Sequence, residues 1–424
     1  MIIFVNRARW SLGYQGIAND YLPTGTISGD PTEPVIEGSA SLATNSGVYQ
    51  KDVYALTSRY IIFHEMGHQL RQGGHLNGLH RWNLMSGAGT TPPTGSGLVL
   101  SAWEKQELGW LTFTEITDDR LGYELADVTA SQQAIKIPAS GNNYFLLEYR
   151  KNNTYYEITP ESECPDAQGL AEGLLVSYSS GGQPTIRPAD NDVADVGTPG
   201  NPRFNGDATD LFPNSGIIEI TPFTTPDTDD HLGNPTGIAI TNIHQSGDKM
   251  VFNIYQNYHT GAWSGNVTSN TAWGGNVTIN SDVTVQSGAT LYIDAGTTIS
   301  FASGSTDLWV EGQIIAKGTS SNPITFTASA ANPQPSEWGT IFVESDDNVF
   351  EHCTIEYSDW GIKIYDTTYL TGNVVKNCTL ENNDQGLRFD NADVTIENNT
   401  IRDNRHGVVA INADGLFTGN SIYD

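Results

Sequence analysis

The chain has 424 residues, more than one hydrophobic core usually organises, so two or three domains are expected. Its 49 acidic and 20 basic residues give a formal net charge of −29. Such a surface repels phosphate backbones, which argues against nucleic acid as a partner and favours calcium and cationic ligands. The three scattered cysteines are too few for a disulfide framework.

Both ends of the chain interrupt a structural pattern. Residues 1–6 lack the basic end and long apolar core of a signal peptide, and they indicate a buried strand cut near its start. No segment is long and apolar enough for a transmembrane helix. The last residues, 420–424, stop within a repeat. We therefore expect truncation at both ends. The abundance of Gly, Thr, Asn and Ser is typical of extracellular proteins rich in strands and turns.

A helix that starts near Asp52 carries the first chemical motif, His64-Glu65-Met66-Gly67-His68. Two histidines four residues apart lie on one helix face and can hold one metal ion, with Glu65 facing the metal's open side. Zinc held in this way lowers the pKa of a bound water toward about 7, and Glu65 can then act as the general base. A plain helix with two surface histidines is the alternative.

The third metal ligand is less clearly marked. Two glycines precede His75 and allow the sharp turn that would bring its imidazole back to the metal, so His75 is the first choice. The alternative is that His75 and His80 are exposed loop histidines. Glu104 is the fallback ligand. However, Ser101 and Glu104 form a capping-box pattern that opens a short helix ending at Gly109, which gives Glu104 a structural role.

A methionine turn follows the metal helix. Met85 lies in the segment 81–87, and a methionine in a tight turn after the zinc helix supports the metal site in metzincin-type peptidases. A lone loop methionine is otherwise most often core filler. Its position after His64 and His68 favours the supporting role.

Together, these motifs resemble the immune-inhibitor-A family of secreted bacterial zinc metallopeptidases. The resemblance covers most of residues 1–256. It includes the zinc helix, the Trp-x-Leu-Met-Ser-Gly turn and the Ser-Ala-Trp-Glu-Lys segment that starts at Ser101. It continues through the segments 144–150, 173–176, 207–213 and 237–243.

The resemblance implies a secreted or cell-surface endopeptidase that acts on proteins or peptides with one catalytic zinc and structural calcium. By position, His64 and His68 would be zinc ligands, Glu65 the base and Met85 the support. The chain departs from the family pattern after the second histidine. The family has a glycine and then a ligand at the positions held here by Arg71 and Gly74, so His75 comes one residue late.

The sequence predicts three domains: a zinc peptidase lobe of metzincin-like α+β fold over 1–118, a β-rich domain over 119–256, and a parallel β-helix over 257–424. The middle domain shows alternating apolar and polar runs between turns, which indicates an antiparallel β-sandwich packed on the catalytic lobe. Its acidic loops suit structural calcium, with solvated loops as the alternative. The candidate calcium ligands are Asp190, Asp192, Asp207 and Asp210.

Internal repetition marks the C-terminal domain. Short motifs that begin at Cys353, Cys378, Asn399 and Asn420 recur with a period of about twenty residues, which is the signature of a right-handed parallel β-helix. Cys353 and Cys378 would stack on adjacent coils, where a disulfide is allowed but not required. Asn377, Asn398 and Asn399 are expected in turn ladders.

Other β-helix residues leave two interpretations open. Arg388, Asp390 and Arg405 could form a lyase-type cluster, but solvated coil faces are favoured. Trp338, Trp360 and Tyr357 could line a sugar-binding groove, but coil packing is favoured.

The leading hypothesis is therefore a monomeric zinc endopeptidase extended by a β-helix. The alternatives are a polysaccharide-binding or polysaccharide-cleaving β-helix with a degenerate peptidase lobe, and a non-catalytic adhesin.

Overall fold

The computed structural model describes residues 17–19, 39–41, 79, 82–83, 100–151, 172–191, 208–302 and 304–423. The zinc-motif residues fall outside these ranges, as do two of the four candidate calcium ligands. The structure therefore neither supports nor contradicts the metzincin-like lobe expected over 1–118. The predicted residues outside the described ranges are His64, Glu65, His68, His75, Met85, Asp192 and Asp207.

Helices are few and short in the part of the chain that the structure describes. The first begins where the sequence predicts a capping box, with Ser101 as the N-cap residue. No helix in the described ranges is long and apolar enough to span a membrane. The helical elements are α2 (Ala102–Glu107), α3 (Val128–Ser131) and the 3-10 turn η3 (Ala208–Asp210).

Strands of the N-terminal half form one isolated pair and two larger sheets. In the five-stranded sheet, β3 and β5 are parallel and the other neighbours are antiparallel. The pair is β1 (Ile17–Asn19) with β2 (Ser39–Ser41). The five-stranded sheet has the order β3 (Thr114–Glu115), β5 (Ile135–Pro138), β6 (Tyr144–Arg150), β7 (Gly173–Ser179), β8 (Thr185–Ile186). The antiparallel three-stranded sheet has the order β4 (Arg120–Ala126), β10 (Lys249–Tyr255), β9 (Ala239–Ser246).

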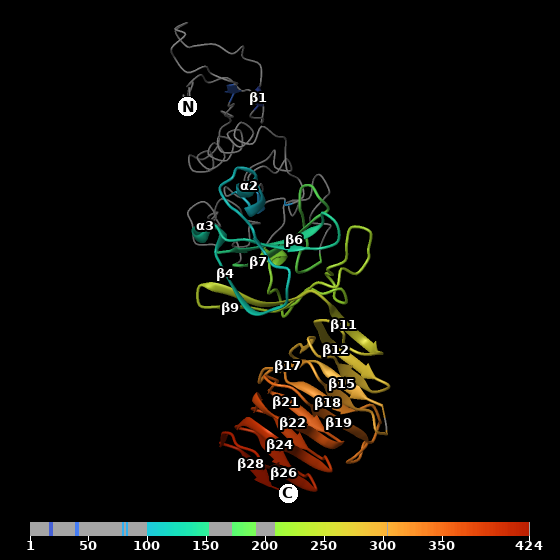
Figure 1. Cartoon of the computed structure of the whole chain (residues 1–424). Helices are drawn as coiled ribbons and strands as arrows, with labels where there is room; N and C mark the ends of the chain where they lie inside the picture. The colour runs from blue at the N-terminus through green and yellow to red at the C-terminus, as the bar shows by residue number, and fades with distance from the viewer. Residues whose placement is uncertain are drawn as a thin grey trace.

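These two larger sheets share one hydrophobic core and form a β-sandwich (Figure 1). Phe145 of β6, Ile240 of β9 and Phe252 of β10 all belong to this core and are fully buried. Strands β6 and β7 are buried along nearly their whole length, because other chain segments cover their second face. Any polar side chain in these two strands must therefore find a partner inside the protein.

One expected strand of this domain does not form. The alternation at 217–220 predicts a strand, but Ile217 and Ile220 make only isolated bridges, to Asn214 and Ile240. Just before the segment, Ser215 and Gly216 both have a positive φ, of 47° and 90°. These two residues form a tight turn that pairs Ile217 back with Asn214.

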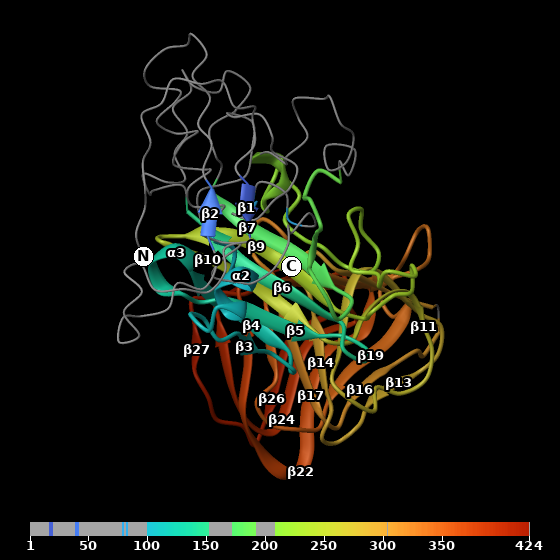
Figure 2. The same cartoon turned by 90° about the horizontal axis from the view of Figure 1, so that it is seen from above.

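From Tyr258 onward the chain is a right-handed parallel β-helix, as the repeats predict. Its coils extend away from the sandwich to the C-terminal end of the chain (Figure 1), and Figure 2 shows the same arrangement from above. The first strands are β11 (Tyr258–Trp263), β12 (Thr271–Ile279), β13 (Val283–Val285), β14 (Thr290–Ile293), β15 (Thr298–Phe301), β16 (Leu308–Val310), β17 (Gln313–Lys317), β18 (Ile324–Ala328) and β19 (Trp338–Val343). The later strands are β20 (Val349–Glu351), β21 (Cys353–Glu356), β22 (Ser358–Lys376), β23 (Thr379–Glu381), β24 (Gln385–Glu397), β25 (Thr400–Arg402), β26 (His406–Ile411), β27 (Phe417–Thr418) and β28 (Ser421–Tyr423).

Three parallel sheets form the walls of the β-helix, and the long strands β22 and β24 bend so that each serves two of them. One sheet runs β14, β17, β20, β22, β24, β27. A second runs β15, β18, β21, β23, β25, β28. We call the third the ladder sheet. It runs β13, β16, β19, the start of β22, the start of β24, and β26.

Stacked apolar side chains and asparagines fill the β-helix interior. Each fully buried Ile, Leu or Phe contributes roughly 1.5–3 kcal/mol by removal from water, which makes this long core the main source of stability. Asn399 joins neighbouring coils because its side-chain oxygen accepts from the Cys378 amide at 2.8 Å. Cys353 and Cys378 are buried, free thiols on adjacent coils, as their equivalent repeat positions predict.

Candidate functional site

Of the residues proposed to bind zinc, the described ranges contain only Glu104, at the start of α2. Its carboxylate is fully buried, and Oε2 accepts from the Ser101 amide at 2.6 Å and from the Ser101 hydroxyl at 2.9 Å. The Ser101 hydroxyl in turn accepts from the Glu104 amide at 3.2 Å. The capping box predicted from the sequence is therefore confirmed. A zinc-binding role for Glu104 remains a fallback prediction.

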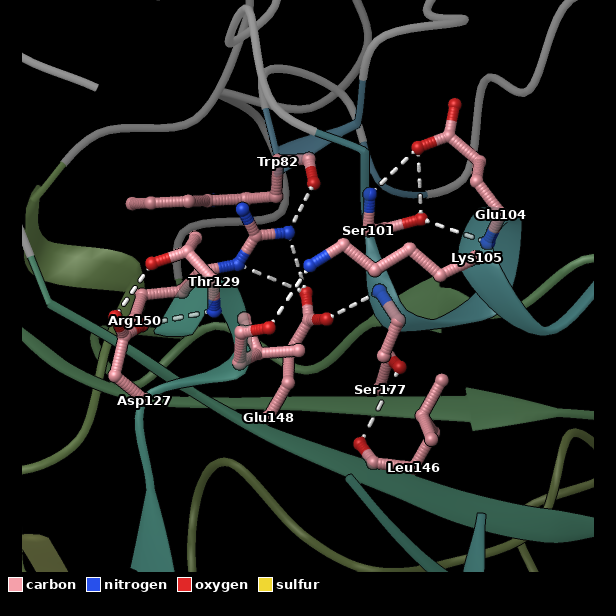
Figure 3. Close-up of polar contacts among 12 residues, drawn as sticks. Trp82, Ser101, Glu104, Lys105, Asp127, Thr129, Leu146, Glu148, Arg150 and Ser177 are labelled. Carbon is pink, nitrogen blue, oxygen red and sulfur yellow. Dashed lines mark hydrogen bonds and ion pairs between the residues drawn. The ribbon is translucent and has the colours of Figure 1, made fainter. Parts of the chain in front are cut away.

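A buried network of charged groups lies beside α2 (Figure 3). Glu148 of β6 accepts from the Nη2 and Nε of Arg150 at 2.6 and 3.0 Å through Oε1. Its Oε2 accepts from the Ala102 amide at 2.5 Å. The two side chains are only 3% and 6% exposed. This pair therefore fixes the start of α2 against the five-stranded sheet.

The same network holds Trp82, which belongs to the predicted methionine-turn segment. The carbonyl oxygen of Trp82 accepts from Arg150 Nη2 at 2.7 Å (Figure 3), and its indole Nε1 donates to Asp210 Oδ2 at 2.8 Å. The Trp82 ring also packs with Leu175 in a small apolar cluster. Two hydrogen bonds and this packing attach the start of the methionine-turn segment to the sandwich.

Two of the four candidate calcium ligands lie in described ranges. Asp210 is 2% exposed and accepts from Trp82, and Asp190 accepts from the Thr209 hydroxyl at 2.5 Å. Within the described ranges, no group of three or more His, Cys, Asp or Glu side chains could hold a metal ion. Structural calcium at these loops remains a prediction.

The outer face of the ladder sheet presents a row of aromatic and basic side chains. Parallel register aligns Trp309 with Phe342, Phe342 with Lys363, and Lys363 with Arg388, one residue from each successive coil. Their neighbours along each strand point inward and are buried, for example Leu308 and Val310. The side chains of this row are half-buried, so they form an outer surface rather than a core.

Aromatic rings surround Lys363. Its Nζ lies 4.4 Å from the ring centroid of Tyr365, 5.1 Å from that of Phe342 and 5.4 Å from that of Trp360. Burial, and secondly the positive charge of Arg388, lower the pKa of Lys363 below its ordinary value. None of the described residues forms a hydrogen bond or an ion pair with Lys363.

Arg388 and Asp390 lie in the same region. Arg388 contacts Asp390 Oδ2 through Nη2 at 2.5 Å and Nε at 2.7 Å, and its guanidinium lies 4.7 Å from the Trp360 ring centroid. Asp390 Oδ1 is buried and has no hydrogen-bond partner. Of the three residues considered for a lyase-type cluster, Arg388 and Asp390 are therefore in contact. The third, Arg405, pairs instead with Asp384 on an exposed edge.

The three aromatic residues considered for a sugar-binding groove do not share one role: two pack in the β-helix and one lies on its outer face. Trp338 is fully buried, stacks on Phe301 at 4.0 Å and donates to the Glu356 carbonyl oxygen, so the packing interpretation is confirmed for it. Tyr357 packs against the β-helix core as well. Trp360 instead contacts Lys363 and Arg388 on the outer face.

Sequence reasoning missed Trp309, Phe342 and Lys363. Trp309 and Phe342 stack with their ring centroids 4.0 Å apart, although irregular turns separate them in the sequence. The available signal was their shared place in the repeat: each stands between two inward apolar residues of its strand. Sequence reasoning also missed the pair of Glu148 and Arg150. Their spacing of two residues along a strand puts opposite charges on the same face.

The fold and this outer row define a parallel β-helix with an aromatic and basic surface on one sheet. Residues 265–365 match the family model described as a pectate-lyase-like β-helix domain. No curated protein and no solved structure matches the chain. Support from known proteins therefore covers residues 265–365 of the β-helix and does not extend to the immune-inhibitor-A resemblance.

Proposed function

We propose that the outer face of the ladder sheet binds a polysaccharide. The observation that carries this proposal is Lys363, a cation enclosed by three aromatic rings and without an anionic partner among the described residues. The likeness of residues 265–365 to a pectate-lyase-like domain supports a carbohydrate ligand. A secreted or cell-surface location fits such a ligand.

The geometry of the row suits an extended glycan. Successive coils of a parallel sheet are about 4.8 Å apart, which is close to the length of one sugar unit, so a chain along the β-helix axis meets one coil per sugar. The edges of Trp309, Phe342 and Trp360 offer apolar contact to sugar C–H groups. Arg388 offers donors for hydroxyl groups.

Replacing Lys363 with methionine should weaken polysaccharide binding about tenfold, because a charge-assisted contact contributes roughly 1.5 kcal/mol. The variant keeps the length of the apolar stem and its packing on the rings. Calorimetric titration of the full chain with soluble polysaccharides measures the effect. Lys317→Met is the matched control, since Lys317 is an exposed lysine on another sheet of the same β-helix. Equal losses in the two variants would refute the ladder site.

We also propose a zinc endopeptidase centre at His64, Glu65 and His68, with His75 as third ligand. The histidine spacing and the order of the motifs that follow it support this second function. Zinc, when bound, would supply a polarised water for peptide hydrolysis. His64 and His68 would hold the metal, and Glu65 would accept the proton of the attacking water and deliver it to the leaving amine.

Glu65→Ala is expected to abolish chelator-sensitive cleavage of casein and to leave zinc bound, because the carboxylate moves a proton and is not a ligand. Elemental analysis of zinc and calcium in the same samples measures metal retention and tests the predicted structural calcium. Glu311→Ala, at an exposed glutamate of the β-helix, is the control and should cleave normally. Residual cleavage by Glu65→Ala at the wild-type rate would show that Glu65 is not the base.

A further inference from the structure

Lys363 stands out among the Lys and Arg residues of the described β-helix because aromatic rings enclose it and no carboxylate lies close enough to form an ion pair with it. The described β-helix has six basic side chains, and four of them form ion pairs with carboxylates. A fifth, Lys317, is exposed on another sheet. The four pairs are Lys376 with Glu397, Arg388 with Asp390, Arg402 with Glu381, and Arg405 with Asp384.

The surroundings of Lys363 are acidic. Residues 257–424 contain 20 Asp and Glu against six Lys and Arg. Three carboxylates, those of Asp390, Glu344 and Asp359, act electrostatically on Lys363 itself. A polymer with a carboxylate on every sugar would bring its next charges against these acidic groups, and the net charge of −29 would slow its approach.

At the position of the row, the coils that precede Lys363 present no charged side chain. At the same position of the ladder sheet they present Trp309 and Phe342, and the coil before them presents Thr284. The next coil presents Arg388, whose charge Asp390 already neutralises. The row therefore combines one free positive charge with uncharged contacts before it and a neutralised pair after it.

We propose that the ligand is a glycan whose acidic sugars are isolated among uncharged ones, and that Lys363 binds one such carboxylate. This inference rests on the polysaccharide-binding function proposed above and specifies the charge density of the ligand. A single carboxylate gains the attraction of Lys363 without placing further charges against Asp390, Glu344 and Asp359. The aromatic edges contact the neighbouring neutral sugars.

Two series of polysaccharides with constant backbones and varied charge test this. The first is polygalacturonate in unesterified, highly methyl-esterified and fully methyl-esterified forms. The second is glucuronoxylan, which has scattered glucuronate groups, with its carboxyl-reduced form. Titration of the full chain should show, in at least one series, binding to the sparsely charged form at least tenfold tighter than to any other form. Lys363→Met should reduce that binding to the level of the uncharged form, whereas Lys317→Met should not.

The other outcomes separate the inference from the proposed function. Tighter binding to unesterified polygalacturonate than to the sparsely charged form of either series would overturn the isolated-charge inference and keep a polysaccharide-binding β-helix. Equal binding to charged and uncharged forms would overturn the role of Lys363 in carboxylate recognition and also keep that function. No binding to either series would overturn both.

Discussion

Replacing Arg150 with methionine is expected to lower the free energy of unfolding of the sandwich by about 3–5 kcal/mol, because it leaves a buried carboxylate without its cation. Glu148 is 3% exposed and would keep only the Ala102 amide among the donors described for it. The Trp82 carbonyl oxygen would lose its bond from Arg150 as well. Denaturant unfolding combined with hydrogen exchange of the β6 and β7 amides measures the effect.

Two further variants test whether the loss comes from the unpaired buried charge. Lys136→Met removes a neighbouring surface ion pair, with Glu115 at 2.9 Å, and should cost less than about 1 kcal/mol because solvent screens exposed charges. The double variant Glu148→Gln with Arg150→Met should be more stable than Arg150→Met, since no lone buried charge remains. A double variant that is less stable than Arg150→Met would contradict this account of the pair.

The β-helix could be predicted because each coil repeats the same local constraints. Thr354, Thr379, Thr400 and Ser421 pair in register, as the recurring motifs predict. The glycines at 361 and 386 are needed for close approach, since a Cβ at either position would lie within 2.7 Å of the carbonyl oxygen of the next coil's glycine. Such constraints appear in the sequence as a period, and the period identifies the fold.

The sequence predicts the same turn position for Asn377, Asn398 and Asn399, but the structure places them in two kinds of position. Asn377 and Asn398 have φ values of 54° and 55°, so they are turn residues in the left-handed region. Asn399 instead points inward and donates to the Val375 carbonyl oxygen at 2.8 Å. Asparagine thus serves both as a left-handed turn residue and as an inward hydrogen-bonding residue. The sequence alone does not distinguish these two roles, because Asn398 and Asn399 are adjacent.

The outer row could not be predicted because it depends on turns of unequal length. The segment 329–337 inserts between β18 and β19, which shifts Phe342 relative to Trp309 in the sequence but not in space. The insertion separates the inward residues Leu308 and Ile341 by the same distance in the sequence, but alternating apolar residues within each strand still mark them, whereas no such local pattern marks the outward row. The outer row is therefore described by the structure but not revealed by the sequence. The zinc motif is the reverse: its local spacing is clear in the sequence, but its residues lie outside the described ranges.

One buried carboxylate lies at the contact between the sandwich and the β-helix, beside a small apolar cluster. Asp294 follows β14 and is 4% exposed. Its Oδ1 accepts from the hydroxyls of Thr241 and Tyr255 at 3.0 and 3.1 Å, and Asn253 and Tyr258 lie at 3.4 Å from its two oxygens. These four donors come from β9, β10 and β11. Asp294 therefore joins the first coils to the three-stranded sheet.

Asp294→Ala should destabilise this contact by about 3 kcal/mol or more, because several buried donors lose their acceptor at a cost of roughly 1–3 kcal/mol each. Hydrogen exchange of the β9, β10 and 290–297 amides in the full chain measures it. Thr325→Ala, on the partly exposed face of β18 and away from this contact, is the control and should change little. Normal protection of these amides in Asp294→Ala would refute the role of the carboxylate.

The same carboxyl group should make the contact stronger in acid. Burial raises the pKa of Asp294 above its ordinary value, against the opposing effect of its hydrogen bonds, and burial with the nearby Asp294 charge raises that of Glu219. Burial raises the pKa of the adjoining Asp119 against the opposing hydrogen bond from the Gln256 amide, and the charge of Asp118 raises it further. A carboxyl whose pKa is raised by folding binds protons more tightly in the folded state. Its contribution to stability is therefore full below the unfolded pKa and is lost as the pH rises through the folded pKa.

Amide protection at the contact should therefore increase as the pH falls from neutral through the folded pKa values. Asp294→Asn, which keeps an acceptor without the charge, should flatten this dependence, and an unchanged pH profile in that variant would assign the effect to Glu219 and Asp119 instead.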